Sequence, residues 1–279
     1  MSKLLFTSSK TPHSIGYIGG GAEHIPLELW PKVPNSDAYQ THLFTLYSDF
    51  LPDNVFPRRN YYISVFISIE EHALGGVKDS ISSKYTVNYQ DDLILLNDGF
   101  SCAVLYEREQ AINKQNLGNI SLERKFFERL DEIDKEADAK YNEDEHLFFE
   151  DNGMGLDVSK IFGNPYFEQD IIYTPPKFNF CLQLLEEDID KKLHIFQNGI
   201  GYFYYDQNVK KKLLSGSQAV FSLFKILKKY HKTFSLDVVY VRYARKRFLL
   251  FRRPLLYCVQ PQLCLRRTGQ PNLPPVAQW

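Results

Sequence analysis

The sequence has little net charge and no long apolar segment. Its 33 Lys and Arg residues nearly balance its 34 Asp and Glu residues, which leaves a net charge of −1. The chain as a whole therefore lacks the basic excess that is typical of nucleic-acid binding, and no segment approaches the roughly 20 apolar residues of a membrane helix. The first residues contain neither a sustained apolar core nor a small-residue cleavage site. We therefore expect a cytoplasmic protein without a signal peptide or a membrane span.

The residue types that build metal and catalytic sites lack the usual spacing. The four cysteines show neither CxxC spacing nor a disulfide framework, and Cys102 and Cys181 lie in apolar runs, where reduced cysteine serves as a small core residue. None of the seven histidines forms HExxH or pairs with cysteine at zinc spacing. No nucleophile elbow, Walker loop or Rossmann fingerprint occurs. We therefore predict no metal, no cofactor and no enzymatic activity.

Two kinds of short motif favour a structural role over a chemical one. Gly19-Gly20-Gly21 supplies the backbone freedom of a turn, but it lacks the Lys-Ser/Thr pair and the strand-to-helix context of a phosphate loop. Glu23-His24 and Glu70-Glu71-His72 place a carboxylate next to an imidazole in sequence, yet neighbours in a strand point to opposite faces. We expect both acid–histidine motifs in loops or at the surface.

Aromatic residues are abundant, and they favour a sheet. They make up 15 % of the chain and are mostly Tyr and Phe, which pack well on a pleated surface. The clearest strand pattern runs from Tyr61 to Ile69, where one alternate set is aromatic and aliphatic and the other is mixed with serine. This period of two predicts a strand with two different faces.

From residue 121 to residue 151 the sequence changes character. Leu122, Phe126, Leu130 and Ile133 recur at helical spacing after a suitable N-cap, Ser121, so we predict an acidic helical insert. The plain interpretation is a solvated amphipathic helix followed by an acidic loop; the sharper one is a surface that docks a basic partner. The residues that would contact this partner are Asp131, Glu132, Asp138, Tyr141, Glu143, Asp144, Glu145, Phe148, Glu150 and Asp151.

Two parts of the chain echo each other. Ile18-Gly19-Gly20 corresponds to Ile161-Phe162-Gly163, and each glycine turn precedes two strand-like runs separated by a spacer. The runs span residues 43–50 and 61–69 in the first part, and residues 178–185 and 201–206 in the second. We predict two pseudo-repeated halves, at about residues 15–106 and 158–220, that share one sheet-rich core.

Four polar or amphipathic residues in the second half are set among apolar ones: Gln169, Gln183, Tyr202 and Tyr204. They could line a pocket. The favoured interpretation is that the two glutamines hydrogen-bond buried backbone around the Gly163–Pro165 turn.

The last part of the chain, residues 233–279, is rich in arginine interleaved with Val, Tyr, Leu and Phe. A basic and aromatic tail can bind RNA or an anionic lipid surface. It can also arise from an altered reading frame, because its arginine usage differs from the Lys-, Asn- and Ile-rich body. We favour the second interpretation, expect a disordered tail, and assign the domain to residues 1–232.

The order of the motifs resembles the YwqG-like family of bacterial proteins of unknown function. In that family a glycine-rich turn leads to a Trp-Pro pair and a segment ending in Leu-Pro, followed by a Gly-x-Pro turn reaching a Gln, a Leu-Gln-Leu strand and a Gly-x-x-Tyr/Phe-Phe strand. The matching residues are Gly19-Gly20, Trp30-Pro31, Leu51-Pro52, Gly163-Asn164-Pro165 with Gln169, Leu182-Gln183-Leu184, and Gly199 to Phe203. The resemblance covers about residues 15–220 and departs at Leu46-Tyr47-Ser48, where the family tends to carry a Gln.

The resemblance implies an α+β fold with a pseudo-repeat, and we predict a sheet-rich single domain built from two such halves. Relatives of this type often look like companions of polymorphic toxins. This context implies a non-enzymatic immunity protein that binds and neutralises a cognate bacterial toxin or secreted effector. The alternative is a small-molecule-binding domain, or an enzyme, with a cleft between the two halves.

Overall fold

The computed structural model describes residues 2–50, 60–85, 98–107, 116–132, 158–166, 178–197, 199–206, 234–236 and 239–241. The chain divides into two compact units, residues 1–246 and 247–279, and all of the described residues belong to the first.

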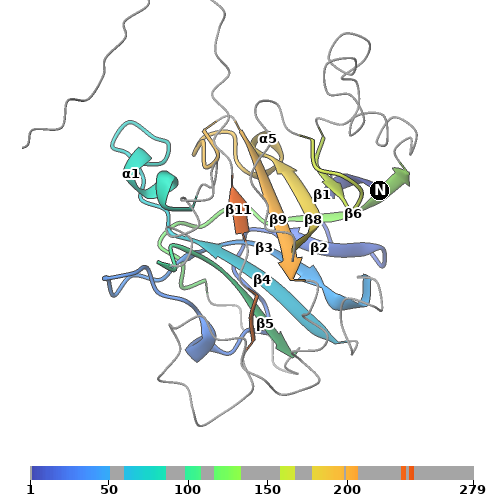
Figure 1. Ribbon diagram of the computed structural model, residues 1–279, viewed down its shortest axis with the longest axis horizontal. Coiled ribbons are helices and arrows are strands. Elements are labelled where there is room, and N and C mark those ends of the chain that lie inside the picture. Colours follow the sequence, from blue (N-terminus) through green and yellow to red (C-terminus); the bar gives the residue numbers. More distant parts are fainter. Residues whose placement is uncertain are drawn as a thin grey trace, which may run out of the picture. The chain divides into compact units, whose positions relative to one another are not determined.

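The described residues form one sheet in which all neighbouring strands are antiparallel (Figure 1). Its strands are β1 (Ser2–Thr7), β2 (Ser14–Ile18), β3 (Thr41–Tyr47), β4 (Tyr61–Ile67), β5 (Ser101–Glu107), β6 (Lys125–Glu132), β7 (Lys160–Ile161), β8 (Phe178–Leu185), β9 (Ile200–Asp206), β10 (Phe234–Leu236) and β11 (Val239–Val241). Their order is β10-β5-β4-β3-β2-β6-β1-β7-β8-β9-β11. The nine strands from β5 to β9 in this order form a curled half-barrel, so the prediction of a sheet-rich domain is confirmed.

Helices are few and short in the described part of the chain. They are α1 (Asp79–Ser82), α5 (Glu186–Ile189) and the 3-10 turns η1 (Leu27–Leu29), η2 (Ser48–Phe50) and η3 (Ser83–Tyr85). None of these helices has the length and apolar character needed to cross a bilayer.

The curl of the sheet brings distant strands together around one core. Phe44 on β3 and Phe203 on β9 have ring centroids 5.6 Å apart, although β2, β6, β1, β7 and β8 lie between their strands in the sheet order. Figure 1 shows β8 and β9 lying across β3 and β4 in the same way. A second contact links the loops at one end, where the Tyr85 hydroxyl donates to the carbonyl of Ile195 at 3.2 Å.

Strands β2 to β5 bury both of their faces. The inner core, inside the curl, includes Leu4, Ile15, Ile18, Leu43, Phe44, Leu46, Ile63, Val65, Ile67, Ala103, Leu105, Phe127, Leu182, Leu184 and Phe203. The outer core, under the segment that joins β2 to β3, comprises Tyr17, Ala22, Ile25, Leu29, Trp30, Tyr47, Tyr62, Phe66, Val104, Tyr106 and Phe126. The alternation predicted from Tyr61 onward is confirmed, because Ile63 and Val65 lie in the inner core and Tyr62 and Phe66 in the outer one.

The helix predicted from residue 121 is wrong where the structure describes it. Residues 125–132 form strand β6, which pairs with β2 on one side and with β1 on the other. The adjacent residues Phe126 and Phe127 enter the outer and the inner core respectively, which a strand allows because its side chains alternate. The apolar repeat that suggested a helix does not mark one face of this strand, because Leu122 lies before β6 and in the inner core whereas Phe126 lies in the outer core. The rest of the proposed insert lies outside the described residues.

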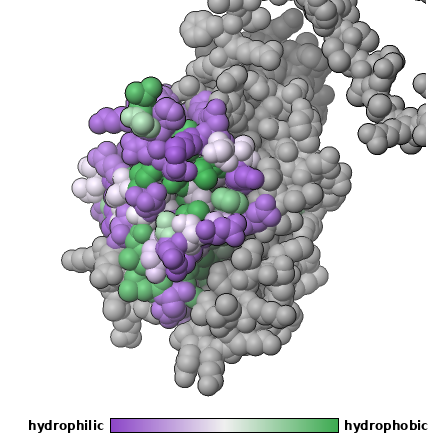
Figure 2. Space-filling model, turned by 90° about the vertical axis from the view of Figure 1, so that its left-hand side faces the viewer, coloured by the Kyte–Doolittle hydropathy of each residue, from purple (hydrophilic) through white to green (hydrophobic). Residues whose placement is uncertain are grey.

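Exposed apolar side chains are scattered rather than gathered on the face that Figure 2 shows. In that view hydrophobic residues lie in several places between hydrophilic ones. The large apolar residues that are exposed among the described residues are Leu5, Leu27, Leu74 and Leu130. Single exposed leucines are normal on a soluble surface and do not by themselves mark an interface.

Candidate functional site

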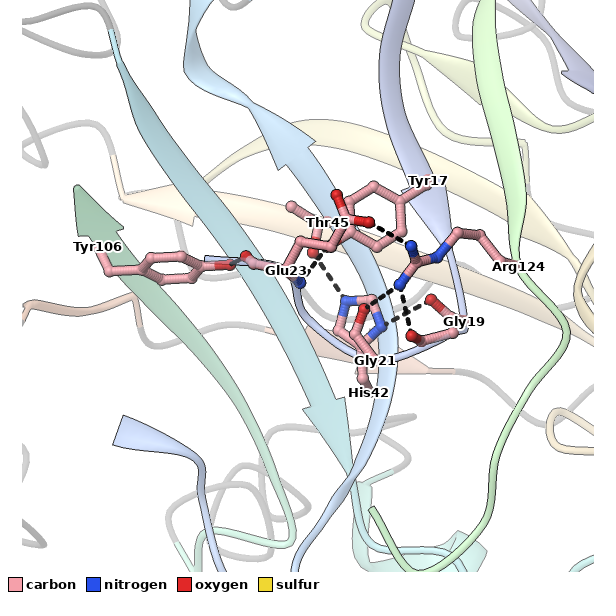
Figure 3. A network of polar contacts seen from close by, with 9 residues as sticks. Tyr17, Gly19, Gly21, Glu23, His42, Thr45, Tyr106 and Arg124 are labelled. Atoms are coloured by element: carbon pink, nitrogen blue, oxygen red, sulfur yellow. Dashed lines mark hydrogen bonds and ion pairs between the residues drawn. The ribbon is translucent and has the colours of Figure 1, made fainter. Parts of the chain in front are cut away.

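A cluster of polar contacts lies on the outer face of four neighbouring strands (Figure 3). We call it the polar network and define it by its side chains: Tyr17 of β2, His42 and Thr45 of β3, Ser64 of β4, Tyr106 of β5, Glu23 of the covering loop and Arg124 just before β6. It lies among outer-core aromatic residues, with Tyr17 and Tyr106 belonging to both groups.

A relay of five hydrogen-bonding contacts crosses the network. His42 Nδ1 lies 3.2 Å from the carbonyl oxygen of Gly19, and its Nε2 lies 2.8 Å from Thr45 Oγ1. The Thr45 and Ser64 hydroxyls are 2.6 Å apart, and the Ser64 hydroxyl is 2.8 Å from that of Tyr106. The Tyr106 hydroxyl donates to the carbonyl of Glu23 at 3.0 Å. The relay therefore begins and ends at backbone carbonyls of the same loop.

The relay is one proton short when His42 is neutral. Both terminal carbonyls can only accept, so five contacts need five protons, but neutral His42 and the three hydroxyl groups supply four. A doubly protonated imidazole would complete the relay. However, burial, followed by the positive charge of Arg124, lowers the pKa of His42 to about 3. Near neutral pH, one contact of the relay therefore lacks a proton.

Arg124 holds the glycine loop against the sheet. Its guanidinium pairs with the Glu23 carboxylate and donates to the carbonyls of Gly20 and, at 3.2 Å, Gly21. It also lies 4.9 Å from the centre of the Tyr17 ring. The two charged side chains are 28 % and 21 % exposed, so this ion pair forms the partly open rim of a buried network.

The glycine turn is structural, as predicted. Gly19, Gly20 and Gly21 all have positive φ angles, of 60°, 66° and 80°. The N–H groups of Gly19 and Gly20 donate to the carbonyls of Leu43 and Leu122, at 2.9 and 2.8 Å. These two N–H groups are committed to the fold and are not directed at a phosphate.

The geometry suits stabilisation better than reaction chemistry. Thr45 and Ser64 are fully buried and His42 is 1 % exposed. Burial also raises the pKa of Tyr17, Tyr47, Tyr85 and Tyr106, so these phenols stay protonated at physiological pH. The network joins the loop to four strands through groups that bond to one another.

His24 lies in a loop, as expected, but it is buried rather than at the surface. It lies in the covering loop, but it is only 3 % exposed and packs edge-on against Tyr62, with ring centroids 5.5 Å apart. Its φ angle is +61°, a conformation uncommon for a residue with a side chain. Its Nδ1 is buried and has no hydrogen-bond partner.

Two of the residues proposed for a second-half pocket, Gln183 and Tyr202, hold the backbone of Tyr166 from both sides of its Cα. The Tyr166 N–H donates to Gln183 Oε1 at 2.8 Å, and the Tyr202 hydroxyl donates to the Tyr166 carbonyl at 2.6 Å. Gln183 Nε2 donates to the carbonyl of Val158 at 2.9 Å. The favoured interpretation of Gln183 as a partner for buried backbone is thus confirmed. Tyr204 is buried against Phe180, and Gln169 lies outside the described residues.

The acidic residues proposed for partner binding are mostly not described. Asp131 and Glu132 end strand β6, where Glu132 pairs with Ser2. Asp138, Tyr141, Glu143, Asp144, Glu145, Phe148, Glu150 and Asp151 lie outside the described residues.

The described ranges contain two free cysteines and no cluster of metal-binding side chains. Cys102 and Cys181 are free thiols, as predicted, and burial raises the pKa of Cys181 to about 12. Within these ranges, no group of three or more His, Cys, Asp or Glu side chains is placed to hold a metal ion.

The polar network was missed from the sequence because its members come from six separate segments. The available signal was the pair of small hydroxyl residues, Thr45 and Ser64, inside two strongly apolar strands. No family model matches this chain, and a search of the curated proteins returns no match.

Proposed function

We propose that this protein is a non-enzymatic immunity protein that binds and neutralises a cognate bacterial toxin or secreted effector in the cytoplasm. The observation that carries the non-enzymatic part is the polar network. Its imidazole and hydroxyl groups are buried and bonded to one another, which supports a role in holding a scaffold together. The family resemblance of the sequence supports the choice of a toxin as partner.

The test is protection of cells that produce the toxin encoded beside this gene. The full chain should restore growth and form a stoichiometric complex with the purified toxin. Growth arrest without complex formation would overturn the proposal. The charge reversals Asp144→Lys and Glu145→Lys test the acidic segment as the contact surface, with Asp37→Lys and Glu71→Lys as a control of equal charge change at exposed positions. If the first pair of substitutions leaves protection unchanged, the toxin contacts another surface of the protein.

We also propose that the sheet contains two repeated halves, as the sequence echo suggests. Ile18 pairs with Phe44 and Ile161 pairs with Leu182. The next residue has a φ angle of 60° in one case and 59° in the other, and its N–H donates to the carbonyl of Leu43 or Cys181. Both β3 and β8 then shift register against the following strand, after His42 and after Phe180. The two halves share these irregularities in the same order, which supports duplication.

A second candidate function is small-molecule binding, which one observation favours. A buried polar atom without a partner is rare in native structures, and Nδ1 of His24 is such an atom. A ligand that donates a hydrogen bond to it would raise the melting temperature. A screen of metabolites and metals against the full chain and the His24→Phe variant tests this candidate. A shift confined to the unsubstituted chain would support it, and no shift from any compound would exclude it.

A further inference from the structure

Two segments that are far apart in the sequence meet at one end of the inner core. Residues 79–85 lie between β4 and β5 and contain α1 and η3, whereas residues 190–197 lie between α5 and β9. Each segment therefore belongs to a different one of the two proposed halves. Tyr85 and Ile195, which share a hydrogen bond, are both fully buried in the inner core. The two segments thus close this end of the core together.

One side chain joins the two segments directly. The amide nitrogen Nε2 of Gln197 donates to Asp79 Oδ1 at 2.7 Å and to Ser82 Oγ at 2.6 Å. Both acceptors are in α1, so both protons of this amide are directed at the other segment. We call Gln197, Asp79 and Ser82 the latch.

Gln197 holds the latch closed against two unfavourable features of its own. Its φ angle is +52°, in the left-handed region that favours glycine, and the φ angle of His194 is +48°. The Gln197 N–H donates to the carbonyl of His194 at 2.9 Å, so both left-handed residues belong to one turn. The second feature is Oε1 of Gln197, which is buried and has no hydrogen-bond partner. Only contacts made elsewhere can keep such a residue in place.

The segment around Gln197 is otherwise organised by contacts within itself. The Asp190 carboxylate accepts from the N–H groups of Lys192 and Leu193, at 2.8 and 3.1 Å. The Glu186 carboxylate accepts from the N–H of Phe196 at 3.0 Å. These contacts can persist while the segment moves relative to α1. The latch is therefore the polar side-chain link that opposes the two unfavourable features.

We propose that the latch is a conformational device that opens one end of the inner core. When Gln197 releases α1, residues 193–197 leave the left-handed turn and move away from residues 79–85. Phe196, which is 2 % exposed in the closed state, then becomes accessible. The paired strands stay folded, so the open state is a local opening of the native protein. This inference goes beyond the proposed function and does not depend on the identity of any partner.

Native-state hydrogen exchange of the full chain tests the latch. Gln197→Glu keeps the shape of the side chain but places a second carboxylate against Asp79, so it should open the latch. The amide protons of Ser82 and Phe196, one in each segment, should both exchange about tenfold faster, while those of β3 and β4 keep their rates. Adding Asp79→Asn supplies an amide donor to the new carboxylate and should restore both rates.

A second variant tests the backbone strain without touching the latch contacts. His194 is exposed, and glycine adopts its left-handed conformation without a steric cost. His194→Gly should therefore slow the exchange of Ser82 and Phe196 by about threefold. Asn35→Gly is the matched control, because Asn35 is also exposed and left-handed, with a φ angle of +61°, but lies in the segment that joins β2 to β3. It should leave both rates unchanged.

Three outcomes would overturn the proposal. Faster exchange at Phe196 without a change at Ser82 would show that the second segment frays by itself. Equal acceleration in β3 and β4 would show global unfolding rather than a local opening. Failure of Asp79→Asn to restore the rates would show that the contact between Gln197 and Asp79 does not control the opening. The His194→Gly measurement does not depend on the folding of the Gln197 variant, and unchanged rates in it would remove the strain from the mechanism.

Discussion

Two buried polar residues at equivalent positions of their strands find hydrogen-bond partners in different ways. Thr45 on β3 and Gln183 on β8 each follow the residue paired with an isoleucine, Ile18 or Ile161, and both are fully buried. Thr45 joins a relay through three strands, whereas Gln183 bonds the backbone of Val158 and Tyr166 directly. At Thr45 several buried side chains hydrogen-bond to one another, whereas at Gln183 a single side chain bonds two backbone groups.

We therefore expect substitution of Gln183 to destabilise the fold more than substitution of Thr45. Gln183→Leu leaves the Tyr166 N–H and the Val158 carbonyl buried without this partner, at about 1–3 kcal/mol each, so we expect a loss of about 3–4 kcal/mol in the free energy of unfolding. Thr45→Val keeps the side-chain shape and should lower it by about 1–2 kcal/mol. Urea denaturation measures both. Equal losses in the free energy of unfolding would show that the two sites do not differ in this way.

The two turns beside these residues differ in their tolerance of a side chain. Gly19 and Phe162 have nearly the same φ angle, +60° and +59°, but a Cβ on Gly19 would lie 2.4 Å from the carbonyl oxygen of Glu123. We expect Gly19→Ala to lower the free energy of unfolding by about 3 kcal/mol, from the left-handed backbone and the clash together.

Gly75→Ala is the matched control for that substitution. Gly75 has a φ angle of +88° and open space around the position of a Cβ, so only the backbone term remains, at about 1 kcal/mol. Thermal or urea unfolding of the two variants separates the clash from the conformational cost. A similar loss in both would show that the loop yields at Gly19.

The two regions should also respond differently to acid. His42 has a pKa of about 3 in the folded state, against about 6.5 when unfolded, so the unfolded state binds more protons between these values. The free energy of unfolding should therefore fall as pH drops below about 6.5, by up to about 1.4 kcal/mol per pH unit from this group. His42→Gln should flatten the profile between pH 6 and pH 4.

Asp188, in α5 after β8, gives the opposite sign. Burial raises the pKa of its carboxyl group, so its contribution to stability declines as pH rises through the titration range of the carboxyl. When the pH is lowered from neutral to 4.5, the rate of hydrogen exchange should therefore increase more in β3 than in β8. An unchanged pH profile in the His42→Gln variant would show that the imidazole is not the source of acid sensitivity.

Particular residues show how far the sequence carried the prediction. The alternation after Tyr61 was sufficient for β4, because strand periodicity is a local property and each face has its own set of side chains. Gln183 was interpretable because a lone amide among apolar residues must find backbone partners. β6 was mistaken because apolar residues at helical spacing are only a local signal, whereas the strand is formed by pairing with the distant strands β1 and β2.

Composition and local sequence pattern were sufficient to predict a strand-rich protein, a structural glycine turn and reduced thiols at Cys102 and Cys181. These properties depend on neighbours along the chain, on backbone freedom and on composition. The order of the strands and the assembly of His42, Ser64, Tyr106 and Arg124 into one network appear only in the tertiary structure. These depend on contacts between segments far apart in the chain, which pair only when the sheet curls and buries both of its faces.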